Sequence, residues 1–111
     1  MNFTANKGQA DEFKKIATAL IEVTKTEADT LGYERFAQGD GKRFTLLETY
    51  VDASATEAHF MGPAVQEWVP KLAATCTVDG FVIYGDPRPK VAAIAGGLGA
   101  VIVPYWMGLD R

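Results

Sequence analysis

Residues 31–51 read LGYERFAQGDGKRFTLLETYV, and this stretch decides the fold because it contains two strand-like runs on either side of one turn. The runs cover 31–38 and 43–51 and are rich in the bulky and β-branched residues that favour strands. Between them, Gly39-Asp40-Gly41-Lys42 provides glycines suited to a tight turn. The stretch therefore predicts two antiparallel strands joined as a hairpin.

Helical patterns and two further strand candidates flank this hairpin. Apolar residues recur at three- and four-residue spacing over 10–26, which predicts an amphipathic helix. A second helical region is expected over 52–74, with a break or kink at 61–63, where the sequence reads Met-Gly-Pro. Short strands are expected at 3–5 and 78–84. The order β-α-β-β-α-β predicts an α+β fold of the ferredoxin-like type with an antiparallel sheet.

The length of 111 residues indicates one domain spanning 1–111, because two cores and a linker would need a longer chain. About 86–111 extends the basic pattern, with a short helix expected over 90–95 and a last strand over 98–107. This last strand is apolar on both alternations, so we expect it to be buried on both sides. The extension is therefore predicted to contribute to a dimer interface.

The sheet itself also favours a homodimer. When both helices cover one face of a four-stranded sheet, the other face stays bare. The predicted strands carry many large side chains that one helical layer is not expected to cover: Leu31, Tyr33, Phe44, Leu46, Tyr50, Val82, Tyr84 and Trp106. A second copy of the sheet would cover them.

Charge and composition argue against several classes of partner. The net charge is -3 and the basic residues are scattered, so no nucleic-acid partner is expected. The uncharged run 91–109 contains glycines and a proline and fits a buried strand better than a membrane span, so no membrane partner is expected. The first nine residues lack the apolar core of a signal peptide, which predicts a cytoplasmic protein.

We also expect neither a metal nor an organic cofactor. The chain has one histidine and one cysteine, and its carboxylates show no ligand spacing. The glycines at 96, 97 and 99 do not follow a first strand or open a helix, as a dinucleotide-binding fingerprint would.

The stretch 43–60, RFTLLETYVDASATEAHF, resembles the middle of the antibiotic biosynthesis monooxygenase family, in which a strand ending in Glu-x-Tyr/Trp-x-Asp precedes a helix with a histidine. Here these residues are Glu48, Tyr50, Asp52 and His59. The pieces KGQADEF and EADTLGYE, which lie earlier in the chain, follow the family's order and spacing, although Ala-Asp replaces its usual Pro-Gly. The resemblance implies a dimeric α/β barrel and, as in some members, cofactor-independent oxidation of quinols or polycyclic phenols.

Three residues are candidates for catalysis: His59, Glu48 and Tyr50. His59 is the only histidine, so any imidazole acid–base chemistry must use it. Glu48 either orients His59 or pairs with Arg35 or Arg43 across the hairpin. The alternative for His59 is a structural histidine on the helix surface or at a helix cap, hydrogen-bonded to a neighbour such as Glu48 or Asp52.

Other residues are candidates for ligand contact or have a structural interpretation. Tyr33, Phe60 and Trp68 are expected to bind a small aromatic substrate by stacking, with core packing as the alternative. Asp52 precedes a helical run and is interpreted as its N-cap.

The expected function is a cofactor-independent monooxygenase that oxidises a quinol or polycyclic phenolic substrate with O2. The alternative is a non-catalytic ligand-binding or stress-response dimer of the same fold, because a fold does not determine chemistry. Heme degradation ranks third, because the chain has Trp68 and Val69 where a heme-binding histidine would be needed in the second helical region.

Overall fold

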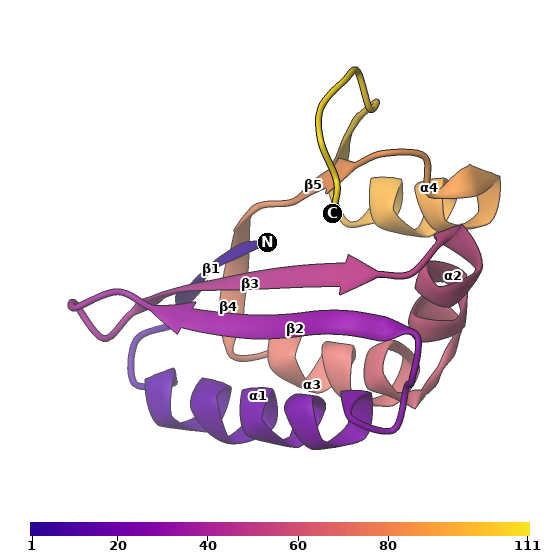
Figure 1. The fold of residues 1–111 in the computed structure, drawn as a ribbon. Coiled ribbons are helices and arrows are strands. Elements are labelled where there is room, and N and C mark those ends of the chain that lie inside the picture. The colour runs from indigo at the N-terminus through magenta and orange to yellow at the C-terminus, as the bar shows by residue number, and fades with distance from the viewer.

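The computed structural model of residues 1–111 contains a four-stranded antiparallel sheet with helices on one of its faces (Figure 1). The strand order is β2-β3-β1-β4, which is the ferredoxin-like α+β arrangement predicted from the sequence. The elements that build it are β1 (Asn2–Ala5), α1 (Ala10–Thr24), β2 (Thr30–Ala37), β3 (Arg43–Tyr50), α2 (Ala53–Met61), η1 (Ala64–Trp68), α3 (Val69–Ala73) and β4 (Cys76–Gly80).

The hairpin of β2 and β3 forms as predicted. Gly41 adopts a positive φ of 70°, which glycine allows without steric cost. The Asp40 carboxylate accepts a hydrogen bond from the Lys42 backbone N–H at 2.9 Å and pairs with Arg43 Nε at 2.6 Å, which holds the turn. The register of the hairpin places Tyr33 opposite Glu48 and Arg35 opposite Leu46.

The face of the sheet toward the helices is the apolar one. Tyr33, Phe44, Leu46 and Tyr50 all lie on this inner face, although the sequence argument for a dimer used them as side chains in need of an outer cover. The outer face is mostly polar and carries Asn2, Thr4, Glu34, Thr45, Thr49, Thr77 and Asp79, with Phe36 and Leu47 half exposed. The four side chains on the inner face therefore need no second copy of the sheet to cover them and do not support a dimer.

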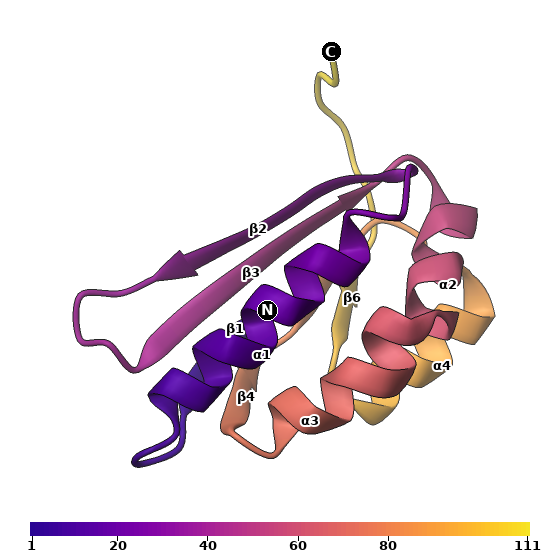
Figure 2. The same ribbon diagram turned by 90° about the horizontal axis from the view of Figure 1, so that it is seen from below.

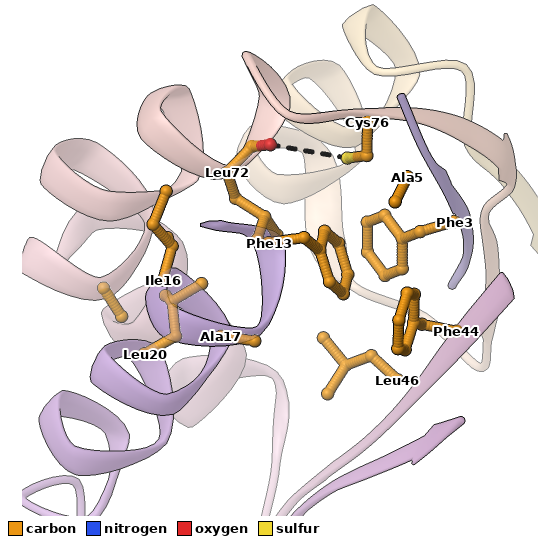
Figure 3. Packing of buried hydrophobic residues seen from close by; sticks show 11 residues of the cluster. Phe3, Ala5, Phe13, Ile16, Ala17, Leu20, Phe44, Leu46, Leu72 and Cys76 are labelled. Carbon is orange, nitrogen blue, oxygen red and sulfur yellow. Dashed lines mark hydrogen bonds between the residues drawn. The ribbon is translucent and has the colours of Figure 1, made fainter. Parts of the chain in front are cut away.

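The core lies between this inner face and α1. Phe13 of α1 is 1% exposed and stacks on Phe44 with ring centroids 4.5 Å apart. The ring centroid of Phe3 lies 5.7 Å from that of Phe13 (Figure 3). The Cys76 thiol is buried and donates to the Leu72 carbonyl at 3.4 Å. The cysteine is therefore part of the packing between β4 and α3.

The second helical region begins and breaks where the sequence predicts. Asp52 caps α2, because its carboxylate accepts the backbone N–H of Ala55 at 2.8 Å. The helix ends at Met61, and the chain resumes after Gly62-Pro63 as η1 and α3. Figure 2 shows that α3 runs beside α1 beneath the sheet, while α2 lies at one end of it.

The C-terminal part differs from the expectation. The strand predicted over 78–84 is split, because Phe81 turns inward and packs with Phe60 and Val91. After this break, β5 (Val82–Tyr84) leaves the main sheet, α4 (Arg88–Gly97) follows, and β5 pairs in parallel with β6 (Val101–Val103). The last strand is therefore three residues long rather than spanning 98–107.

The end of the chain extends away from the body (Figures 1 and 2). Every residue from Val101 onward is exposed, and Trp106 is 84% exposed. Within one chain the predicted burial of this segment does not occur. The sheet is also open, with β2 and β4 as its edges, so a barrel would require a second chain.

None of the helices combines the length and apolar character that crossing a bilayer requires.

Candidate active site

The candidate site is centred on His59, in the last turn of α2. Its side chain is only 3% exposed and lies between two tyrosine rings of the sheet. The ring centroids of Tyr33 and Tyr50 are 5.8 Å and 5.5 Å from that of His59. The Asp52 cap and the position of α2 at the end of the sheet together aim the histidine at β2 and β3.

Both ring nitrogens of His59 face carboxylates. Nδ1 lies 2.8 Å from Glu27 Oε1 and 3.1 Å from Glu27 Oε2. Nε2 lies 3.3 Å from Glu48 Oε1, and the Tyr50 hydroxyl donates to the same oxygen at 2.9 Å. Glu27 comes from the turn after α1 and Glu48 from β3, so three separate segments meet at one imidazole.

These contacts set the protonation state of the histidine. Burial lowers the pKa of His59, but the hydrogen bonds and negative charges of Glu48 and Glu27 outweigh burial, so its pKa is raised above the usual value. The favoured form carries a proton on each nitrogen and donates to both carboxylates. The two carboxylates therefore shift the histidine toward its protonated form relative to a free imidazole.

The two tyrosines stay protonated. Burial and the charge of Glu48 raise the pKa of Tyr50 far above its usual range. Burial also raises the pKa of Tyr33, against the opposing charge of Arg35. The Tyr33 hydroxyl accepts a hydrogen bond from Arg35 Nη2 at 2.9 Å, so both phenols have fixed partners.

A cavity of about 90 Å³ lies beside this cluster, between the sheet, η1 and α3. Its walls are almost entirely apolar, with Arg35, Glu48, His59 and the Tyr33 ring at one side. Two lining residues, Val78 and Leu98, are 43% and 44% exposed and mark its mouth. The remaining walls are Met1, Phe3, Leu20, Leu46, Phe60, Val65, Val69, Leu72, Ala73, Cys76 and Phe81.

The structure brings together most of the predicted site. His59, Glu48, Tyr33 and Phe60 line the cavity, and Tyr50 contacts both His59 and Glu48. Between the alternatives for Glu48, the structure shows the His59 partner.

Trp68 lies elsewhere. It packs against the core from η1, with Lys71 Nζ 4.3 Å from its ring centroid, and borders a different surface hollow beside α1. This position follows from the break at Gly62-Pro63, which starts a new helical segment that turns Trp68 away from His59.

Sequence reasoning missed two members of the site. Glu27 is a partner of the histidine, and Arg35 lines the cavity. Glu27 is separated from His59 by 32 residues. Its only sequence signal was its place at the head of EADTLGYE, one of the pieces that carried the family resemblance. Arg35 had been considered only as a partner for Glu48.

No three side chains among His, Cys, Asp and Glu are arranged to hold a metal ion. The arrangement supports proton transfer, because an imidazole and a carboxylate lie at the wall of an apolar cavity.

The fold and the site define a small ferredoxin-like α+β protein with acid–base side chains against an enclosed cavity. More specifically, the chain belongs to the antibiotic biosynthesis monooxygenase family, whose sequence profile matches residues 1–71.

Solved structures share the fold. MupZ from Pseudomonas fluorescens is 17% identical with a TM-score of 0.81, and the match covers 99% of this chain and 89% of that one. A candidate antibiotic biosynthesis monooxygenase from Deinococcus radiodurans is 18% identical with a TM-score of 0.62, covering 69% and 78%. The protein SO0527 from Shewanella oneidensis is 28% identical with a TM-score of 0.56, covering 61% and 67%.

The match to MupZ includes β5, α4 and β6, which the family profile does not reach. The C-terminal arrangement is therefore part of a shared fold. No curated protein matches the chain significantly.

Proposed function

We propose that this protein is a cofactor-independent monooxygenase that oxidises a quinol or phenolic substrate with O2. The observation that carries the proposal is the Glu48 carboxylate at the wall of an apolar cavity, held there by donors from His59 and Tyr50. A substrate bound in this cavity would meet one group able to accept a proton and little water, which favours formation of a reactive anion.

Glu48 is the proposed base. The donors His59 and Tyr50 both reach Oε1, and no hydrogen bond reaches Oε2, which leaves that oxygen to accept a substrate proton. His59 and Tyr50 act with Glu48 as the proposed catalytic group, in which the imidazolium holds the carboxylate in place. This assignment replaces the histidine base expected from the sequence, because both ring nitrogens of His59 already face carboxylates and neither is free to take a substrate proton.

The proposed reaction needs no cofactor because the substrate supplies the electrons. Loss of the phenolic proton gives an anion with high electron density on a ring carbon. That carbon transfers electrons to O2 and forms a C–O bond, and the resulting peroxide anion takes back the proton held by Glu48 to give a hydroperoxide. Breaking the O–O bond with loss of water leaves a quinone, so one oxygen atom enters the product and the other leaves as water.

The size of the cavity restricts the substrate. An apolar cavity of about 150 Å³ is known to hold a benzene ring, whereas the cavity here measures about 90 Å³. A one-ring quinol therefore requires a small displacement of the walls, and a polycyclic phenol requires a large one. The half-exposed Val78 and Leu98 at the mouth are the side chains that this displacement would move first. Tyr33 and Phe60 are the proposed stacking residues.

The test is oxygen uptake by purified protein with methylhydroquinone and a naphthalenediol, measured against the spontaneous rate without protein. We expect protein-dependent uptake that a chelator does not change.

The second candidate is a non-catalytic ligand-binding protein of the same fold. It is favoured by the small cavity and by the contacts of both Glu27 and Glu48 with His59. Saturable binding without uptake would establish that alternative.

We also propose a homodimer in which the exposed end of the chain lies against a second copy. Between Val101 and Leu109, seven large apolar side chains are exposed, including Trp106 at 84% and Leu109 at 78%. An apolar segment of this kind is typical of an interface rather than of a free surface. Two open sheets brought together in such a dimer would form the dimeric α/β barrel that the family resemblance implies.

The free, buried Cys76 fits the proposed cytoplasmic location, where thiols stay reduced.

A further inference from the structure

Arg35 is a half-buried cation with two buried nitrogens, and the protein leaves these nitrogens without partners. Its Nη2 donates to the Tyr33 hydroxyl at 2.9 Å, but Nε and Nη1 are buried and have no acceptor. The guanidinium carbon lies 5.3 Å from the centroid of the Tyr33 ring and 6.0 Å from that of Phe3. These rings hold the group in place without supplying an acceptor for its remaining donors.

An unpaired buried charge of this kind is costly and calls for an explanation. Arginine stays protonated in proteins, so it cannot avoid the cost by losing its proton. Buried cations are normally paired with a carboxylate or another acceptor. Arg35 forms no ion pair, and the neighbouring Glu48 is engaged by His59 and Tyr50. Its free donors are therefore available to an anion that enters from outside the chain.

Arg35 is one of the residues that line the cavity. Arg35 lies opposite Leu46 in the hairpin, and Glu48 is two residues further along β3 on the same face. Diagonal neighbours of this kind have backbone positions roughly 7–8 Å apart. Both side chains line the cavity, with the Tyr33 ring on the same wall. A small ligand in the cavity can therefore reach the cation and the carboxylate at once.

We propose that Arg35 binds the oxyanion of an aromatic ligand, a phenolate or the enolate of a related ring ketone, inside this cavity. Its role in turnover rests on the proposed monooxygenase: the phenolic O–H bond breaks, the proton passes to Glu48, and the electron pair stays on the oxygen held by Arg35. Binding of the anion itself does not depend on turnover.

Two other groups at the same cavity can carry a positive charge: His59, whose ring nitrogens both face carboxylates, and Met1, through its N-terminal ammonium. The Met1 ammonium donates to the Leu46 carbonyl at 2.7 Å, and burial lowers its pKa against the opposing charge of Glu48. Because this ammonium already donates to the Leu46 carbonyl and its pKa is lowered, it is a poorer anion site than Arg35. A substitution of Arg35 leaves this ammonium unchanged and so separates the two.

The test uses 4-nitrophenol, whose anion is yellow and whose protonated form is nearly colourless. Wild-type protein is titrated with it across its ionisation range without O2, and the absorbance of bound ligand gives its protonation state. We expect wild type to bind the anion in preference to the neutral phenol and to lower the ligand's apparent pKa. Nitrobenzene, which has no ionisable oxygen, should bind without a dependence on Arg35.

Arg35→Gln should weaken binding of the anion about 10- to 100-fold, the usual range for losing a hydrogen bond to a charged group, and should abolish the shift in the ligand's pKa. Arg35→Lys keeps the positive charge and should retain part of the shift in the ligand's pKa. This variant still tests the proposal if Arg35→Gln folds poorly. Arg43→Gln is the matched control, because Arg43 is exposed and pairs with Asp40 at the hairpin turn.

Two results would overturn the proposal. One is wild-type protein that does not bind nitrophenolate. The other is a shift of the ligand's pKa that is as large in folded Arg35→Gln and Arg35→Lys as in wild type. Because no turnover is measured, a protein that binds the anion but never consumes O2 would refute the monooxygenase and leave the anion site standing.

Discussion

Glu27 Oε1 lies 2.8 Å from His59 Nδ1, although 32 residues separate them in the chain. The contact joins the turn between α1 and β2 to the end of α2. With Glu48 on the opposite ring nitrogen, it fixes both the orientation and the charge of the imidazole. Several consequences of this arrangement are measurable.

The stability of the fold should depend on pH through His59. Its pKa is raised in the folded protein, so its stabilising contribution is complete below the unfolded value of about 6.5 and is lost as pH rises through the folded value. In urea unfolding, the excess stability of wild type over His59→Gln should therefore decrease as the pH rises above about 6.5. A difference that stays constant or grows over this range would show that the folded pKa is not raised.

Removing the charge of Glu27 should lower the pKa of His59. Because the chain has a single histidine, its ring proton gives an unambiguous signal in an NMR titration. We expect Glu27→Gln to titrate at lower pH than wild type, since one of two negative partners is lost. Glu22→Gln is the control, because Glu22 is exposed and pairs with Lys25 on α1. Equal midpoints in wild type and Glu27→Gln would contradict the assignment.

The core prediction concerns Phe13, which is 1% exposed and stacked on Phe44. Phe13→Ala should reduce the free energy of unfolding by about 3–5 kcal/mol, because it removes a large buried ring and leaves a cavity. Chemical denaturation measures this directly. Ile21→Ala, in the same helix but only partly buried, should cost clearly less.

Sequence patterns were sufficient for the regular parts of the fold. The hairpin, the amphipathic α1 and the break near Pro63 follow from local periodicity and turn chemistry, and each lies close to its predicted range. The end of the chain did not follow, because its apolar residues fit a buried strand equally well in any sheet. Only the inward turn of Phe81 decides that β5 leaves the main sheet.

The candidate site, like the fold, could be predicted where its residues lie close together in the sequence. His59 and Glu48 lie on adjacent elements of one motif, so their contact could be anticipated. Glu27 and the cavity position of Arg35 depend on how α1 and β2 pack against distant segments, which local patterns do not specify. The outward or inward alternation of β2 and β3 was also open, and this is why the sequence argument for a dimer used the wrong face.

The dimer prediction now rests on the end of the chain. Sedimentation equilibrium at micromolar concentration should give about twice the chain mass of 12.0 kDa. Trp106→Glu should weaken association, because it places a charge within the apolar segment 101–109, whereas Thr18→Glu on the exposed side of α1 should not. A wild-type mass near that of one chain would refute the dimer.

The central claim is that Glu48 removes a substrate proton and so starts oxidation by O2. The most direct test is the rate of oxygen uptake with methylhydroquinone by wild type, Glu48→Gln and Glu34→Gln, the last being an exposed glutamate on the neighbouring strand. We predict protein-dependent uptake in wild type, an unchanged rate in Glu34→Gln, and a loss of roughly 10²- to 10⁴-fold in folded Glu48→Gln, the usual cost of removing a general base. Wild-type uptake that persists in Glu48→Gln, or saturable binding of the quinol without any uptake, would contradict the account.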